Sequence, residues 1–186
     1  MARRVGSLMV CLGAALVIAA CGGDAAPART AHTALPGEPP LVQVDGYTYQ
    51  DPTATDLEIA HVKDFLATAD EMPQMFTAVS AHRVEGAGGA AWLLQAQLGP
   101  VLSDPDMQEQ MLRGSLTDPT SDSPAALETI SGELVSVGMG ESVAGKSVLG
   151  FMWIHEGVMS TMFGDDADKT REFVTEYLAV ANAPSE

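Results

Sequence analysis

Basic residues are scarce in this chain of 186 residues, which has nine Lys and Arg against 25 Asp and Glu and a net charge of −16. A chain this acidic repels nucleic-acid phosphates and anionic lipid head groups. We therefore expect no nucleic-acid partner. The charge favours high solubility or a cationic partner instead.

Cysteine is scarcer still, since Cys11 and Cys21 are the only two. Both lie near the N-terminus, so the rest of the chain has no disulfide and no reactive thiol. Its stability therefore has to come from packing.

Familiar catalytic motifs are also missing. The sequence has no Gly-x-Ser-x-Gly nucleophile turn, and His155-Glu156 lacks the second histidine of a zinc-protease helix. No pair of acids stands out among the 25 carboxylates. An enzyme, most simply a hydrolase, is therefore an alternative interpretation and not the favoured one.

The N-terminus has the pattern of a secretion signal. Arg3 and Arg4 provide a positive start, and residues 5–20 form an apolar run too short to span a bilayer well. A retained transmembrane helix is the alternative, but residues 22–24 carry no basic stop-transfer flank. The two arginines leave the twin-arginine route open beside general secretion.

Ile18-Ala19-Ala20-Cys21 resembles the lipobox of bacterial lipoproteins, in which a branched aliphatic and two small residues precede a cysteine. The resemblance implies diacylglycerol transfer to the Cys21 sulfur, cleavage before Cys21, and often acylation of the new N-terminus. Two or three acyl chains anchor a protein stably. The implied location is the extracytoplasmic face of the cell membrane, with residues 1–20 removed as signal peptide.

The remaining chain divides into a tether and one domain. Residues 21–44 hold the lipidated cysteine and an Ala- and Pro-rich stretch without periodicity, which indicates a flexible tether. Residues 45–184 are long enough for a single hydrophobic core.

Strand and helix patterns alternate along residues 45–184. Strands are expected at 44–49, 80–84, 90–98, 133–139, 147–155 and 158–163, although 91–98 fits a helix equally well. Helix starts are expected at a Thr55/Glu58 capping box, at Ser103-Asp104-Pro105, and at Asp165 or Asp166. Glu156-Gly157 predicts a two-residue turn that places His155 opposite Val158 and Trp153 opposite Ser160.

These elements predict a single α+β domain, a largely antiparallel sheet with helices on one face. Residues 93–116 and 159–178 share the order strand, glycine, acidic cap and helix, which points to two related hairpin-plus-helix units. The arrangement resembles secreted lipoproteins of unknown function from high-GC Gram-positive bacteria.

Residues 140–147 fit the phosphate-loop pattern Gly-x-x-x-x-Gly-Lys-Ser. That loop holds phosphate because a helix follows it and offers its N-terminal amides. Here residues 148–154 have the composition of a strand. We therefore interpret residues 140–147 as a glycine-rich connection between strands.

Two groups of side chains have the chemistry of a metal site. A copper site would draw on His82, His155, Met152, Met159 and Met162. A calcium site would draw on Asp165, Asp166 and Asp168 with Asp104 or Asp106. Alternating methionines are usually core filling, and acids in a first helical turn are explained by capping and the helix dipole. We therefore expect no metal and no cofactor.

The sequence thus predicts a membrane-anchored extracytoplasmic lipoprotein that acts as a non-catalytic binding or envelope-assembly protein. The expected partner is an envelope protein or a small apolar or cationic ligand. An extracytoplasmic hydrolase and a metal-binding lipoprotein are the alternatives.

Lipidation can be tested by mass spectrometry of the protein extracted from its native membrane. The expected N-terminal residue is Cys21 with a diacylglycerol thioether, and Cys21→Ala should abolish incorporation of labelled fatty acid. An unmodified thiol at Cys21 would contradict the lipobox interpretation.

Overall fold

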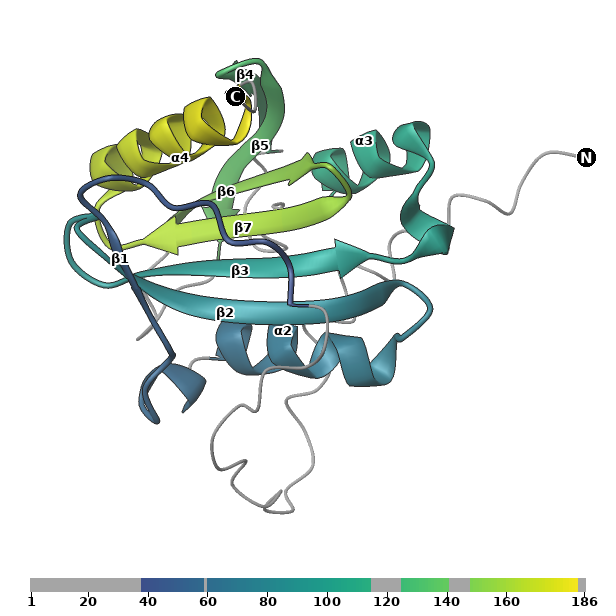
Figure 1. Ribbon diagram of the computed structural model, residues 1–186, viewed down its shortest axis with the longest axis horizontal. Coiled ribbons are helices and arrows are strands. Elements are labelled where there is room, and N and C mark those ends of the chain that lie inside the picture. The colour runs from purple at the N-terminus through teal and green to yellow at the C-terminus, as the bar shows by residue number, and fades with distance from the viewer. Residues whose placement is uncertain (1–37, 59, 115–124, 141–147, 184–186) are drawn as a thin grey trace, which may run out of the picture.

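A computed structural model describes residues 38–58, 60–114, 125–140 and 148–183. Its centre is one antiparallel sheet of seven strands in the order β1-β2-β3-β7-β6-β5-β4 (Figure 1). The strands are β1 (Thr48–Gln50), β2 (Phe76–Glu85), β3 (Ala91–Leu98), β4 (Ala126–Ile130), β5 (Glu133–Gly140), β6 (Val148–His155) and β7 (Val158–Gly164). The α-helices are α2 (Ala60–Glu71), α3 (Pro105–Gly114) and α4 (Ala167–Ala181), and two 3₁₀ turns are η2 (Asp56–Glu58) and η3 (Pro100–Leu102). The predicted α+β class and antiparallel sheet are confirmed.

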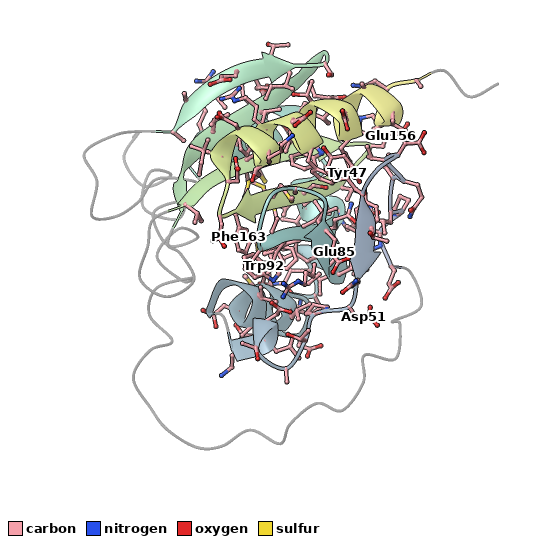
Figure 2. The ribbon with its side chains drawn as sticks, turned by 90° about the vertical axis from the view of Figure 1, so that its left-hand side faces the viewer. Tyr47, Asp51, Glu85, Trp92, Glu156 and Phe163 are labelled. Carbon is pink, nitrogen blue, oxygen red and sulfur yellow. The ribbon has the colours of Figure 1, made fainter. Side chains whose placement is uncertain are left out.

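Helices cover both faces of this sheet, so the expectation of helices on one face was wrong. On β3, Leu93 belongs to the core under α4, whereas its neighbour Trp92 belongs to the core under α2 and α3. Figure 2 shows Trp92 together with Phe163, and Tyr47 on the side of α4. Successive side chains of a strand point to opposite faces, so the central strands are buried on both.

The two tightest hairpins are set by residues with positive φ. Glu156 (φ 48°) and Gly157 (φ 77°) join β6 to β7, and the predicted pairs His155 with Val158 and Trp153 with Ser160 are confirmed. Ser131 (φ 49°) and Gly132 (φ 91°) join β4 to β5 in the same way. β4 was not predicted, although the Ser131-Gly132 dipeptide is a signal for a turn.

A reciprocal box precedes α2 at Thr53 and Asp56: the Thr53 N–H donates to Asp56 Oδ2 (2.8 Å) and the Asp56 N–H donates to Thr53 Oγ1 (3.2 Å). The predicted box of Thr55 and Glu58 depends on the Glu58 side chain, which lies outside the described part of the structure. The cap of α3 is Asp104 and not the predicted Ser103 hydroxyl: Asp104 Oδ1 accepts from the N–H groups of the first turn. At α4, where Asp165 and Asp166 were both candidates, the cap is Asp166.

Part of the predicted tether packs on the domain. We call residues 38–47 the strap. Pro39 and Val44 are buried, and Leu41 and Val42 pack against the core under α4. Figure 1 shows the strap crossing β3 and β2 on the face that carries α4. The folded domain therefore begins before residue 45, the predicted boundary.

The arrangement of α3 and α4 does not fit a repeated hairpin-plus-helix unit. Because β3 and β7 are antiparallel neighbours, the rotation that exchanges them is perpendicular to the sheet and keeps each face on its own side. A repeated helix would then lie on the same face in both copies. Met111 and Leu112 of α3 pack on one face, but Phe173 and Leu178 of α4 pack on the other.

The sheet ends at β1 and β4. Of these, β1 has only 3 residues. Glu128 on β4 accepts two hydrogen bonds from the guanidinium of Arg171 on α4, at 2.7 and 3.3 Å. The same guanidinium lies 5.2 Å from the ring centre of Phe151. The outer strand β4 is therefore clamped to α4.

Among the described residues, no helix is long and apolar enough to cross a membrane.

Gly164, where β7 leads into α4, has no room for a side chain. A Cβ at this position would lie 2.7 Å from Thr170 Oγ1 and 2.9 Å from the Cβ of Ala91. Gly164→Ala should therefore lower the free energy of unfolding by about 1–3 kcal/mol, measured by urea denaturation.

Gly114 at the end of α3 is the matched control, because a Cβ there would meet nothing within 4 Å. Gly114→Ala should leave the protein unchanged or stabilise it by about 0.5 kcal/mol. Equal losses for both variants would contradict the packing at Gly164.

Candidate functional site

Four polar or partly polar side chains form a line across the middle of the sheet, on the face that α4 covers. We call Ser80, Gln95, Ser160 and Trp153 the polar row. They are paired in register from β2 through β3 and β7 to β6. Gln95 and Trp153 are 0% exposed. Ser160 and Ser80 are buried beside them, so a line of hydrogen-bonding groups lies inside an apolar core.

The hydrogen bonds of the polar row are only partly made. Gln95 Nε2 donates to the Tyr177 hydroxyl (3.0 Å) and to Ser160 Oγ (3.4 Å). Gln95 Oε1, Ser80 Oγ and Trp153 Nε1 have no hydrogen-bond partner among the described residues. Leaving such a group buried and unpaired costs about 1–3 kcal/mol each. The polar row therefore offers one acceptor, one donor and one hydroxyl that can act as either.

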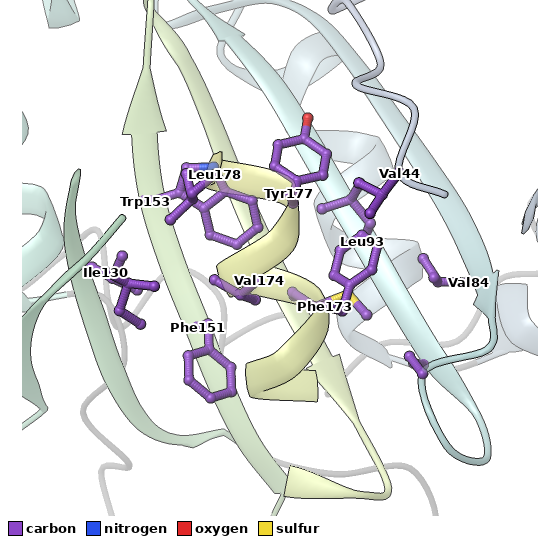
Figure 3. Close-up of a cluster of buried hydrophobic side chains, with 14 of the residues drawn as sticks. Val44, Val84, Leu93, Ile130, Phe151, Trp153, Phe173, Val174, Tyr177 and Leu178 are labelled. Atoms are coloured by element: carbon purple, nitrogen blue, oxygen red, sulfur yellow. The ribbon is translucent and has the colours of Figure 1, made fainter. Parts of the chain in front are cut away.

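Aromatic rings surround the polar row, whose four members have no ionisable side chain. The ring of Tyr177 lies 5.4 Å from that of Trp153 and 5.7 Å from that of Phe173, and Figure 3 shows these rings beneath and along α4. Burial raises the pKa of Tyr177, although hydrogen bonds to Val42 and Gln95 act in the opposite direction. The hydroxyl therefore stays protonated, and no side chain of the polar row carries a charge.

The strap meets this site through its backbone. The backbone of Val42 is hydrogen-bonded to the Tyr177 hydroxyl, which in turn accepts from Gln95. Figure 3 shows Val44 close to Leu93 and Tyr177. Among the described residues, the only backbone-to-backbone hydrogen bond of the strap is internal, from the Tyr47 N–H to the Val44 carbonyl.

The strap is consequently held weakly. Full burial of one Val or Leu side chain contributes about 1.5–3 kcal/mol, and only Val44 and Pro39 are buried, with Leu41 and Val42 covered in part. Ordering the backbone costs about 1–2 kcal/mol per residue. For residues 38–45 this cost is at least as large as the gain from burial, so burial alone gives the strap no margin of stability.

Asp56 is a second buried polar group, and it differs from the polar row in being fully paired. Its carboxylate accepts from the Thr53 N–H and hydroxyl (2.8 and 2.6 Å), from Trp92 Nε1 (3.0 Å) and from Arg83 (3.3 Å). Burial raises the pKa of Asp56, but these hydrogen bonds and the guanidinium outweigh it and hold the pKa below its ordinary value. Asp56 thus fixes η2 to β2 and β3 and has no capacity left for a ligand.

The phosphate-loop match does not have the required topology. Gly140 ends β5 and pairs with Val148, the first residue of the antiparallel strand β6. Residues 141–147 lie outside the described part of the chain. A strand therefore follows the motif where a nucleotide site needs a helix.

The candidate copper ligands are divided between the two faces. Met152 and Met159 belong to the core under α2 and α3, whereas Met162 belongs to the core under α4. His155 Nδ1 lies 2.8 Å from Glu133 Oε1, and the ring centre of His82 lies 6.3 Å from that of Tyr49. Burial lowers the pKa of His82. These side chains cannot share one metal ion.

The candidate calcium ligands are far apart. The Asp165 N–H donates to the Ala90 carbonyl at one end of β3, and Asp104 follows the other end. β3 has 8 residues, which at about 3.3 Å each separate the two groups by roughly 25 Å. No group of three or more His, Cys, Asp or Glu residues within the described ranges could hold a metal ion. Cys21 lies outside those ranges.

The turn at Glu156-Gly157 predicted the pair Trp153–Ser160, but no local signal in the sequence connects this pair to Gln95 and Ser80. That connection depends on the β3–β7 pair, which joins residues 65 positions apart.

No protein-family model, curated protein or solved structure matches this chain.

The variant Gln95→Leu tests whether the polar row serves ligand binding or stabilises the fold. Gln95→Leu keeps the volume and removes a buried amide oxygen that has no partner, but it also removes the Nε2 donor to Tyr177 and Ser160. Because these two effects oppose each other, the free energy of unfolding of the ligand-free protein should change by less than about 1 kcal/mol, measured by urea denaturation. A loss above about 1 kcal/mol would show that the polar row stabilises the fold.

Asp56→Asn is the control for a satisfied buried group. It should lower the free energy of unfolding by about 2–4 kcal/mol at pH 7. Because the folded-state pKa of Asp56 is depressed, its contribution is present above the unfolded pKa near 4 and is lost as the pH falls through the folded value. The difference between the variant and the parent protein should therefore shrink under acid.

Proposed function

We propose that this protein is a membrane-anchored extracytoplasmic lipoprotein that binds a ligand on the α4 face of its sheet without acting on it. The observation that carries the binding role is the set of three buried, unpaired polar atoms in one register line: Ser80 Oγ, Gln95 Oε1 and Trp153 Nε1. The lipobox match at Cys21 supports the anchor.

The polar row favours an uncharged ligand group. It presents an amide oxygen, an indole N–H and a hydroxyl, and it contains neither a carboxylate nor a base. A ligand that buries hydroxyl or amide groups here would satisfy all three, while its apolar parts would contact the surrounding rings. A cation would find no counter-charge in the row, so the acidic surface is better suited to solubility.

A non-catalytic role is favoured by the positions of the histidines. Neither His82 nor His155 hydrogen-bonds a serine hydroxyl among the described residues, and His155 is engaged with Glu133. A serine hydrolase needs a base within hydrogen-bond reach of its nucleophile. The hydrolase alternative therefore has less support than binding.

Native mass spectrometry of the protein purified from its own membranes tests the proposal. We expect a non-covalent small-molecule adduct of constant mass. Gln95→Leu should weaken the binding of the adduct about 5- to 150-fold and so lower its occupancy, because an unpaired ligand group costs about 1–3 kcal/mol.

Gln97→Leu is the matched control. Gln97 lies two residues along β3 on the same face, and its side chain donates to the Gly157 carbonyl (3.0 Å) instead of pointing into the polar row. This variant should keep the adduct. Absence of any adduct from the parent protein, or equal loss in both variants, would overturn the proposed binding site.

A further inference from the structure

We propose that the strap is a releasable cover of the polar row, so that the site exists in a closed and an open form. The inference rests on the proposed function, because it describes how access to that same site is regulated. It also assigns the strap a second effect, since its release lengthens the link between the domain and the membrane.

The attachment of the strap is unlike that of the rest of the sheet. Ladder hydrogen bonds begin only at Thr48, which pairs with Glu85. Before that residue, the strap is held by the burial of Val44 and by partial packing of its neighbours. Its backbone is also hydrogen-bonded at Val42 to the Tyr177 hydroxyl, and at Val44 it lies beside the Tyr49 hydroxyl. A segment with few backbone bonds and little buried surface opens well before the whole protein unfolds.

A hinge lies at the correct place for such an opening. Gly46 has φ +88°, and nothing lies within 4 Å of the position a Cβ would take. On its C-terminal side, the ring of Tyr47 packs edge-on against Phe173 at 4.9 Å. A side chain at Gly86 would lie 2.8 Å from the Gly46 carbonyl oxygen, so the chain is fixed from this point onward. Residues 38–45 can therefore swing while β1 stays paired.

The strap occupies a position that a ligand needs. Tyr177 already accepts a hydrogen bond from Gln95, and the strap backbone at Val42 is hydrogen-bonded to the same hydroxyl. A hydroxyl- or amide-bearing ligand that reaches the unpaired atoms of the row would compete for Tyr177 and displace Val42. Released residues 38–45 would add roughly 25 Å to the reach of the tether.

Thiol labelling of full-length, membrane-bound protein with a soluble maleimide tests the release. Val44→Cys places a thiol in the strap, and Leu93→Cys places one beneath it in the same core. Val44→Cys should label at least about 100-fold faster than Leu93→Cys in the absence of urea. Low urea concentrations should accelerate Leu93→Cys steeply and Val44→Cys only slightly, because strap release exposes little surface.

Tyr177→Phe adds a test of the contact itself. Loss of the hydroxyl should speed labelling of Val44→Cys about fivefold relative to Leu93→Cys, the change expected from one hydrogen bond. Should circular dichroism show that Val44→Cys is unfolded, the half-buried Leu41 takes its place as Leu41→Cys.

Equal rates with equal urea dependence in the two positions would overturn the releasable strap. Labelling of Val44→Cys as fast as a free thiol would also overturn it, since the strap would then not cover the site. Both results leave the native mass spectrometry of the adduct untouched, so failure of the strap and failure of the binding site can be told apart.

Discussion

The antiparallel pairing of β3 with β7 is the contact on which the rest of the structure depends. Each of the two hairpins that it joins is closed by its own local turn. Only the β3–β7 ladder merges them into one sheet and sets Gln95 opposite Ser160. Both strands are buried on both faces, as the adjacent residues Trp92 and Leu93 show on β3 and Met162 and Phe163 show on β7. The core under α4, the core under α2 and α3, and the polar row therefore share one ladder.

Local features of the sequence predicted much of this fold, whereas contacts between distant segments of the chain could not be predicted. Glu156-Gly157 predicted the register of one hairpin, and Asp165-Asp166 predicted the start of α4, because each of these signals lies within a few neighbouring residues. An apolar stripe shows that a helix packs on something but not which face of a sheet it meets, so α3 and α4 were placed on the same side. The strap was missed because Leu41, Val42 and Val44 lie in a stretch whose Ala and Pro content resembles a linker.

In the candidate site, too, local pairs were predictable and pairs between distant strands were not. Trp153 and Ser160 were paired from the turn alone, whereas Ser80 and Gln95 needed the order of strands in the sheet. Asp56 and the polar row also show two opposite uses of buried polarity: Asp56 accepts from three different side chains and a backbone N–H, while the polar row keeps three atoms unpaired. The first arrangement stabilises the fold. The second lowers its stability in a way that a bound ligand can recover.

The proposed membrane anchor makes the protection of the sheet edges important. Proteins held in one membrane plane meet one another sideways and at high local density, which favours strand addition between neighbours. An open strand edge is the usual starting point of such aggregation. Here β1 is too short to act as a template, and Glu128 on β4 carries a charge that Arg171 holds at the rim. Crowded copies should consequently stay separate particles on the membrane and not fuse into continuous sheets.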